Sequence, residues 1–251
     1  MTVSNDLPAG WRFKCVPEIK STNAEVLKLA AGGEEEGLVL RAEQQTKGRG
    51  RRGRSWASPK GNLYLSILIN APLVIAGQVS FAAALALYDA IELVISGDTS
   101  GLMYKWPNDL ILDGAKVAGV LLEAVPDRDQ VVVGFGVNVV PTEVENALYP
   151  VGSLTPGTVL VELDTLAFSI CRALESWLKK WRDMGFAPLR KSWLDRAQGL
   201  HQPILVQLPN ESLNGTFENL AEDGGLIIRQ GGGAQRVIQA GDVFFSPRKE
   251  T

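Results

Sequence analysis

The residues best suited to chemistry form a cationic segment, KGRGRRGR, at positions 47–54. Five cations stand there in eight residues, and three glycines separate them. Arginine offers a planar set of donors that matches phosphate or carboxylate geometry, and glycine lets backbone N–H groups approach an anion closely. The segment is therefore predicted to be a loop that clamps a polyphosphate. Since its charges repel and no apolar residue anchors it, we expect it to be mobile without a ligand.

Charge alone leaves three other interpretations open: a solvated loop, a single-stranded nucleic-acid site, or a localisation signal. A net charge of −3 and a pI of about 5.4 argue against a nucleic-acid binder. Trp56 follows the loop and would offer an apolar platform for an adenine ring. A GxxxxGK[ST] P-loop is absent, and the glycines at 48, 50 and 53 open no predicted helix, which argues against a dinucleotide fingerprint.

Composition points to a globular chain in a reducing compartment. Its 251 residues, 45% hydrophobic and 21% charged, allow one large domain or a catalytic domain with a small appendage. Cys15 and Cys171 are expected to be free, buried thiols, and with one histidine they are too few for a structural zinc site. The N-terminus lacks a signal-peptide pattern, and residues 71–95 carry carboxylates, so we expect a cytoplasmic protein without a membrane span.

Helices and strands alternate along the part of the chain that must position the loop. Ser21 is the predicted N-cap of a helix that ends before Gly32-Gly33. Asp113-Gly114 is the predicted turn of a hairpin over 109–124. The remaining strands are expected at 37–43, 62–70, 103–106 and 130–139, and the remaining helices at 76–95, 163–181 and 188–196.

The pattern changes after Gly199, where short strands alternate with turn residues. These strands are expected at 203–208, 213–220, 225–230, 235–238 and 243–246. Five short strands suggest a small β-barrel, so the predicted domains are residues 1–199 and 200–251. The strands of the first domain come in hairpin pairs rather than βαβ units. This order predicts an α+β fold with a mainly antiparallel sheet.

Several motifs together resemble the biotin–protein ligases, over about residues 10–200. They are SerThrAsn at 21–23, QTKGRGRRGRSWASPKGNLYLS at 45–66, KWPNDL at 105–110, GAKVAGVLLE at 114–123 and GFGVN at 134–138. The resemblance implies a catalytic core similar to class II aminoacyl-tRNA synthetases, followed by a small SH3-like barrel. It also implies a reaction in two steps. Biotin and ATP form biotinyl-5′-AMP, and a lysine of a carboxylase's biotin carboxyl carrier domain then attacks the mixed anhydride.

Such a reaction depends on positioning and on charge stabilisation, in which Mg²⁺ shares. The resemblance assigns to biotin Ser21, Thr22, Asn23, Gln45, Gly48, Arg49, Arg51, Lys116 and Gly119. It assigns to the nucleotide Arg51, Arg54, Trp56, Asn108, Lys116 and Asn138. Lys116, Arg49 and Arg51 are the candidate catalytic residues, and Asp109 is the candidate Mg²⁺ ligand. Simpler roles also fit: Ser21 and Thr22 as helix caps, Trp56 as a core residue and Lys116 as a solvated hairpin lysine.

The chain departs from many ligases of this type at its N-terminus. Only about twenty residues precede the SerThrAsn motif, so we expect no DNA-binding domain and no DNA partner. Lys47 adds a charge to the loop with an effect that the sequence does not explain. A lipoate–protein ligase, which shares the fold and chemistry, is the alternative, although the block from Gln45 to Trp56 favours biotin. Open sheet edges also allow a homodimer.

Overall fold

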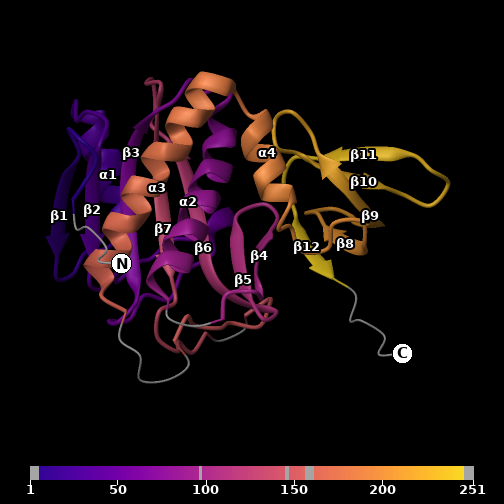
Figure 1. The fold of residues 1–251 in the computed structure, drawn as a ribbon, viewed down its shortest axis with the longest axis horizontal. Helices are drawn as coiled ribbons and strands as arrows, with labels where there is room; N and C mark the ends of the chain where they lie inside the picture. Colours follow the sequence, from indigo (N-terminus) through magenta and orange to yellow (C-terminus); the bar gives the residue numbers. More distant parts are fainter. Residues whose placement is uncertain (1–5, 96–97, 145–146, 156–160, 246–251) are drawn as a thin grey trace.

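The computed structural model describes residues 6–95, 98–144, 147–155 and 161–245 (Figure 1). A seven-stranded sheet in the order β1-β2-β3-β7-β6-β5-β4 forms its larger part. Its strands are β1 Arg12–Val16, β2 Leu38–Ala42, β3 Leu63–Asn70, β4 Leu102–Lys105, β5 Asp109–Leu112, β6 Ala115–Ala124 and β7 Gln130–Val137. The helices are α1 Thr22–Ala31, α2 Val79–Val94, α3 Leu163–Met184 and α4 Ala187–Leu194, with short 3₁₀ turns η1 Arg51–Gly53 and η2 Ala76–Gln78.

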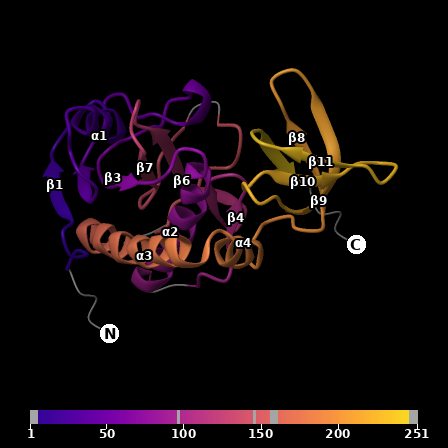
Figure 2. The same ribbon diagram turned by 90° about the horizontal axis from the view of Figure 1, so that it is seen from above.

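Helices cover the two faces of this sheet unequally, as the view from above shows (Figure 2). α2 and α3 pack together on one face, and α1 lies on the other. Alternate strand residues therefore enter different apolar clusters: Val39 and Ile67 face α2, whereas Leu40 and Leu68 face α1. Because α1 is short, it leaves part of its face uncovered, and the functional cavity described below lies there.

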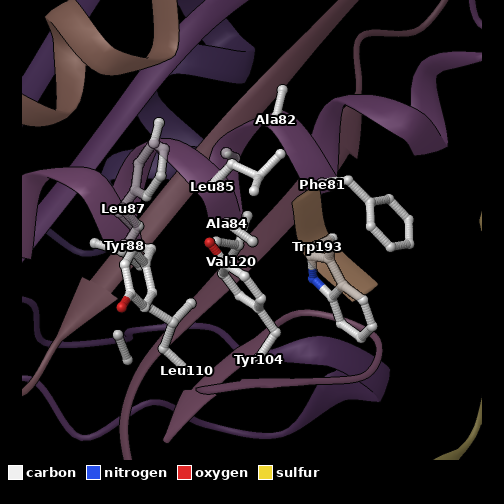
Figure 3. Packing of buried hydrophobic residues seen from close by; sticks show 14 of the residues in the cluster. Phe81, Ala82, Ala84, Leu85, Leu87, Tyr88, Tyr104, Leu110, Val120 and Trp193 are labelled. Atoms are coloured by element: carbon white, nitrogen blue, oxygen red, sulfur yellow. The ribbon is translucent and has the colours of Figure 1, made fainter. Parts of the chain in front are cut away.

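α2 is the central core helix, buried between the sheet and α3. Small alanines let it lie close to both neighbours, and larger residues fill the space towards α4 (Figure 3). There the ring of Trp193 stacks on Tyr104 at 5.5 Å and meets the edge of Phe81. The segment Ala76–Val94 is long and apolar enough to cross a membrane by length and composition alone, but most of it is buried inside this fold.

The N-terminal strand corrects the sequence prediction in two ways. β1 was not expected, and it pairs in parallel with β2 across α1, which makes a βαβ unit and a mixed sheet. The remaining pairs in this sheet are antiparallel. Cys15 is exposed rather than buried, because it lies on this edge strand, whereas Cys171 is buried in α3. The RFKCV pattern carries two cations and too few apolar residues to stand out as a strand.

A separate five-stranded antiparallel sheet follows α4, in the order β11-β10-β9-β8-β12. Its strands are β8 Pro203–Gln207, β9 Ser212–Leu220, β10 Leu226–Arg229, β11 Gln235–Ile238 and β12 Asp242–Phe245. The Trp106 indole donates to Gly224 O at 3.0 Å, and this buried bond fixes the second sheet against the first unit. The fold is therefore α+β, with a mixed sheet and an antiparallel sheet. The domain boundary after residue 199 stays a prediction.

Candidate functional site

A cavity of about 140 Å³ lies on the α1 face of the large sheet. Both units and the arginine–glycine loop, residues 47–54, contribute to it. The predicted residues that line it are Ser21, Thr22, Asn23, Gln45, Arg49, Arg51, Arg54, Trp56, Asn108, Asp109, Lys116 and Gly119. Gly134 and Gly136 of the GFGVN motif line it as well, so the structure brings together residues from all five sequence motifs.

One end of the cavity is rich in uncharged hydrogen-bonding groups at the start of α1. Ser21 caps this helix, since its hydroxyl accepts from Ala24 N at 3.4 Å. Gln45 Oε1 accepts from the Thr22 backbone N–H at 2.8 Å and from the Thr22 hydroxyl at 3.1 Å. Helix capping and the predicted ligand role are compatible here, because the same groups cap the helix and line the cavity.

The floor of the cavity needs strand residues without side chains. A Cβ on Gly134 would collide with the Asn23 amide, and one on Gly136 would lie 2.6 Å from Cε2 of Trp56. Gly48, which the family resemblance assigned to biotin, does not line the cavity. It is buried, and a Cβ there would collide with Ser58 Oγ and Trp56 O. Its observed part is therefore to let the loop pack beside Trp56.

The arginine–glycine loop is tied to three different elements. Arg49 pairs with Glu123 of β6 at 2.8 Å, and Arg51 donates to Asn108 Oδ1 at 3.1 Å. Arg52 and Arg54 both pair with Asp242 of β12, at 3.1 and 2.8 Å. The loop thus reaches from the large sheet to the small one across the mouth of the cavity. Lys47 is exposed and does not line the cavity.

The charged end of the cavity is built on the β5–β6 hairpin. Lys116 Nζ lies 2.7 Å from Asp109 Oδ1 and 5.1 Å from the centre of the Trp56 ring. Asp109 is 8% exposed, so this pair lies largely out of bulk water. The described part of the chain holds no group of three or more metal-ligating side chains. Asp109 as a Mg²⁺ ligand therefore stays a prediction.

A second cavity of about 330 Å³ adjoins the first and shares Trp56 with it. Arg54, Trp56 and Lys116 line both cavities, and Asn138 lines only this second one. The Asn138 side chain donates to Gly152 O at 3.2 Å. The Trp56 Nε1 atom is buried and has no hydrogen-bond partner among the described residues. The predicted nucleotide set is therefore distributed over two adjoining cavities that Lys116 and Trp56 separate.

Four charged or aromatic residues of the site were not predicted from the sequence. Lys105 is 4% exposed, and its Nζ lies 3.0 Å from the ring centre of Tyr149. Burial lowers the pKa of Lys105 to about 7, and the nearby Asp109 carboxylate opposes this change. Asp242 and Glu123 hold the loop. Lys105 and Glu123 stand inside the KWPNDL and GAKVAGVLLE motifs, whereas Tyr149 and Asp242 stand outside all five motifs.

Comparison with known proteins gives the same family for both units. Residues 15–138 match the biotin/lipoate A/B protein ligase family, and residues 199–246 match the biotin protein ligase C-terminal domain. A biotin–[acetyl-CoA-carboxylase] ligase of Paracoccus denitrificans is 42% identical over 240 residues, which cover 90% of this chain and 97% of that protein. The ligase of the same name from Mycobacterium tuberculosis is 33% identical over 242 residues, 94% and 90% of the two chains.

The fold comparison agrees with the sequence matches. The biotin protein ligase from Aquifex aeolicus, solved in complex with biotin and ATP, superposes with a TM-score of 0.79 at 26% identity. The match covers 93% of this chain and 97% of that one. The family models match both units, and the two relatives match along nearly their full length. The chain therefore belongs to the biotin/lipoate A/B protein ligase family, among its biotin protein ligases.

Proposed function

We propose that the protein activates biotin with ATP to biotinyl-5′-AMP and transfers the biotinyl group to a lysine of a carboxylase's biotin carboxyl carrier domain. One observation carries this proposal. A single cavity has uncharged hydrogen-bonding groups at one end and the Lys116–Asp109 pair with Arg51 and Arg54 at the other. Biotin has the same polarity, with a ureido ring at one end and a carboxylate at the other.

The uncharged end suits a urea. A buried ureido group needs donors and acceptors together, or it loses its hydrogen bonds to water without replacement. Ser21 and Thr22 supply hydroxyl groups, and Gln45 supplies an amide. A lipoyl dithiolane has no polar ring atoms of this kind, so these side chains favour biotin over lipoate.

The charged end suits adenylation. Two anions, the biotin carboxylate and the α-phosphate, must meet, and charge then builds up at phosphorus. Lys116 lies where the two cavities adjoin, so its ammonium can contact both anions, and Arg51 and Arg54 add charge-assisted donors. This work is positioning and electrostatic stabilisation, and it requires no protein nucleophile.

The second cavity is the proposed nucleotide site. Trp56 offers a ring face for adenine, and Asn138 offers an amide. Carboxylate oxygen is a ligand that Mg²⁺ accepts beside ATP phosphates, and Asp109 supplies one at the charged end of the first cavity. When bound, Mg²⁺ would share the negative charge of the phosphates.

Finer statements about the molecule are part of the same proposal. We infer a core of the class II aminoacyl-tRNA synthetase type over residues 1–199 and an SH3-like barrel over residues 200–251. The mixed sheet and the separate five-stranded antiparallel sheet support this assignment. A cytoplasmic location is supported by two free cysteines. A homodimer is a further proposal, supported by the edge strand β1.

Biotin-dependent exchange of pyrophosphate into ATP tests the first step. With Mg²⁺ and ATP present, adding biotin should start exchange, and adding lipoate at the same concentration should not. Exchange that lipoate supports as well as biotin would contradict the assignment of the uncharged end to a ureido ring. Exchange with neither acid would contradict the adenylating function as a whole.

A further inference from the structure

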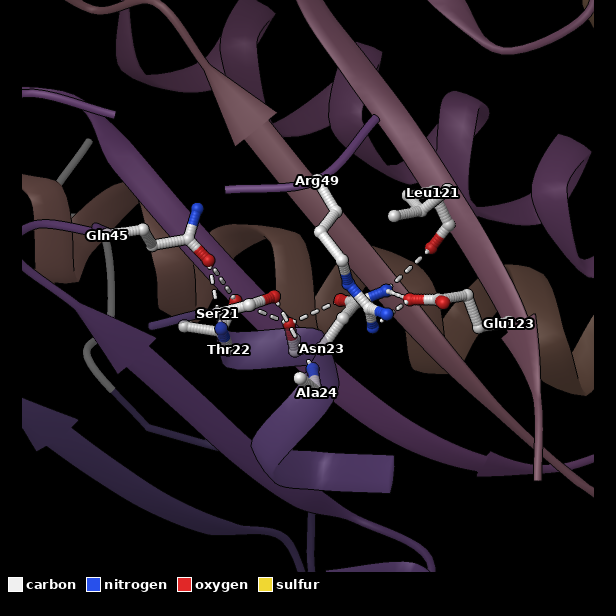
Figure 4. Close-up of polar contacts among 9 residues, drawn as sticks. Ser21, Thr22, Asn23, Ala24, Gln45, Arg49, Leu121 and Glu123 are labelled. Atoms are coloured by element: carbon white, nitrogen blue, oxygen red, sulfur yellow. Dashed lines mark hydrogen bonds and ion pairs between the residues drawn. The ribbon is translucent and has the colours of Figure 1, made fainter. Parts of the chain in front are cut away.

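Glu123 of β6 joins the arginine–glycine loop to the uncharged end of the cavity. A single atom, Oε2, accepts from Arg49 Nη2 at 2.8 Å and from Asn23 Nδ2 at 2.9 Å (Figure 4). The loop and the first turn of α1 are therefore held by the same carboxylate oxygen. Neither the sequence motifs nor the proposed chemistry gives Glu123 a role.

Asn23, the α1 residue that donates to Glu123, is itself held in place. Asn23 is 4% exposed, and its Nδ2 also donates to Leu121 O at 3.3 Å. An amide nitrogen has two donors, so both are engaged. The amide oxygen lies 2.6 Å from the buried hydroxyl of Ser66, and Gly134 leaves room for the whole group. Asn23 therefore holds Glu123 in place and has no free N–H for a ligand.

The same contacts continue to the predicted ureido site. Ser66 Oγ lies 2.7 Å from Thr22 Oγ1, and Gln45 Oε1 accepts from the Thr22 backbone N–H at 2.8 Å. The single Ser66 proton goes to the Asn23 amide oxygen, so the Thr22 hydroxyl donates to Ser66 when the chain is continuous. An unbroken chain of polar contacts thus connects Gln45 to Arg49 through Ser66 and Glu123. Hydrogen bonds in such a chain polarise one another, so a ligand on Thr22 or Gln45 changes the contacts that orient Glu123.

We propose that Glu123 is a positioning residue that holds the arginine–glycine loop over the bound adenylate through Arg49. Its contact with Asn23 makes loop closure depend on the ring end of the cavity. The inference rests on the proposed function, because it concerns retention of biotinyl-5′-AMP. Glu123 does not line the cavity and acts through Arg49 rather than on substrate.

The exposure of the pair decides where its effect should be measured. The side chains of Arg49 and Glu123 are 41% and 25% exposed. A partly exposed ion pair contributes little to folding stability. The expected effect therefore lies in the rate at which the loop opens and releases adenylate, and not in the melting temperature.

Glu123→Gln is the sharpest substitution, because it keeps an acceptor for Asn23 and removes the charge that attracts Arg49. The enzyme–biotinyl-5′-AMP complex is formed first, and release of adenylate is followed after dilution into excess unlabelled biotin and ATP. Glu123→Gln should release adenylate about fivefold faster than wild type, the upper range for an exposed pair. Glu35→Gln is the matched control, since it removes the same charge from an exposed position that does not line the cavity.

Two further measurements test whether Glu123 acts through Arg49, and they do not depend on the Glu123→Gln variant alone. In an Arg49→Gln background, Glu123→Gln should add nothing, because its partner is gone. In the wild type, release should accelerate with added NaCl, because salt screens an exposed pair. Unchanged release in Glu123→Gln, or an equal further acceleration in the Arg49→Gln background, would overturn the inference while the proposed function stands. A wild-type enzyme that forms no biotinyl-5′-AMP would overturn the proposed function and this inference with it.

Discussion

At the scale of single residues, Lys116 is the residue on which the proposed adenylation most depends. It lines both cavities and pairs with Asp109 at 2.7 Å. A lysine in a surface hairpin would ordinarily be solvated, but this one lies beside a carboxylate that is 8% exposed. Lys116 makes no contact at the uncharged end of the cavity. Binding of the biotin ring and activation of the biotin carboxylate should therefore be separable.

Lys116→Ala should therefore slow adenylation severely while biotin still binds. Removing one charge-assisted contact to a transition state lowers the rate by about 10²–10³-fold. Calorimetry should show biotin bound, and the pyrophosphate-exchange rate should fall by that factor. Parallel losses of biotin affinity and exchange rate would show instead that Lys116 serves binding alone.

Lys105 should give the folded protein a recognisable dependence on pH. Its pKa is lowered by burial to about 7 from an ordinary value of 10.5. Between these values the unfolded chain binds more protons than the folded one, so the free energy of unfolding should rise with pH across this window.

Lys105→Met should remove this dependence, because it places an uncharged side chain in the same space. The melting temperature of Lys105→Met relative to wild type should be highest near about pH 6 and should fall towards about pH 9. Lys60→Met, at an exposed position, is the control and should show no such trend. A difference between Lys105→Met and wild type that stays constant with pH would argue that Lys105 is charged throughout.

At the scale of elements, the arginine–glycine loop and the strands beneath it need different explanations. The loop holds its place by ion pairs to Glu123 and Asp242, and its cationic residues are mostly exposed. Exposed ion pairs are individually weak. The strands, in contrast, hold the floor by backbone pairing and by glycines that leave room for Asn23 and Trp56.

Hydrogen exchange should show the loop opening. Amides of residues 47–54 should exchange fast in the free protein, since weak contacts allow frequent local opening. Biotin with ATP should slow them, while amides of β3 and β7 should be slow in both states. A loop that is equally protected with and without ligand would contradict the clamp.

Gly136→Ala tests the strand floor. An added Cβ would lie 2.6 Å from the Trp56 ring, so the indole must move. The KM for ATP should rise about tenfold, the equivalent of one stacking contact, and the affinity for biotin should change less. Gly77→Ala is the matched control, because no atom lies within 4 Å of a Cβ there. An unchanged KM for ATP would remove Trp56 from the nucleotide site.

These elements also show what sequence can predict. Strong periodicity and turn residues correctly predicted α1, the β5–β6 hairpin and the five C-terminal strands. β1 was missed because an exposed edge strand needs few apolar residues and takes its parallel pairing from β2. Within the site, too, local sequence does not reveal contacts between distant segments. Tyr149 and Asp242 become site residues only through contacts between segments distant in the sequence.

At the scale of the whole molecule, the site exists because two units meet. Asp242 of the small sheet holds Arg52 and Arg54, and Phe244 packs on Tyr149 at 5.1 Å, next to Lys105. The net charge of −3 is therefore compatible with a locally cationic cavity, since its cations are gathered by the fold. The small sheet contributes to the mouth of the cavity rather than forming a separate appendage.

The central claim is that this chain biotinylates a carboxylase carrier domain. The most direct measurement is intact-mass analysis of a purified carrier domain after incubation with the protein, biotin, ATP and Mg²⁺. We predict a gain of one biotinyl group, which is lost when the acceptor lysine is replaced by arginine or when the enzyme carries Lys116→Ala. A carrier domain whose mass stays unchanged, although the wild-type protein binds biotin and ATP, would contradict it.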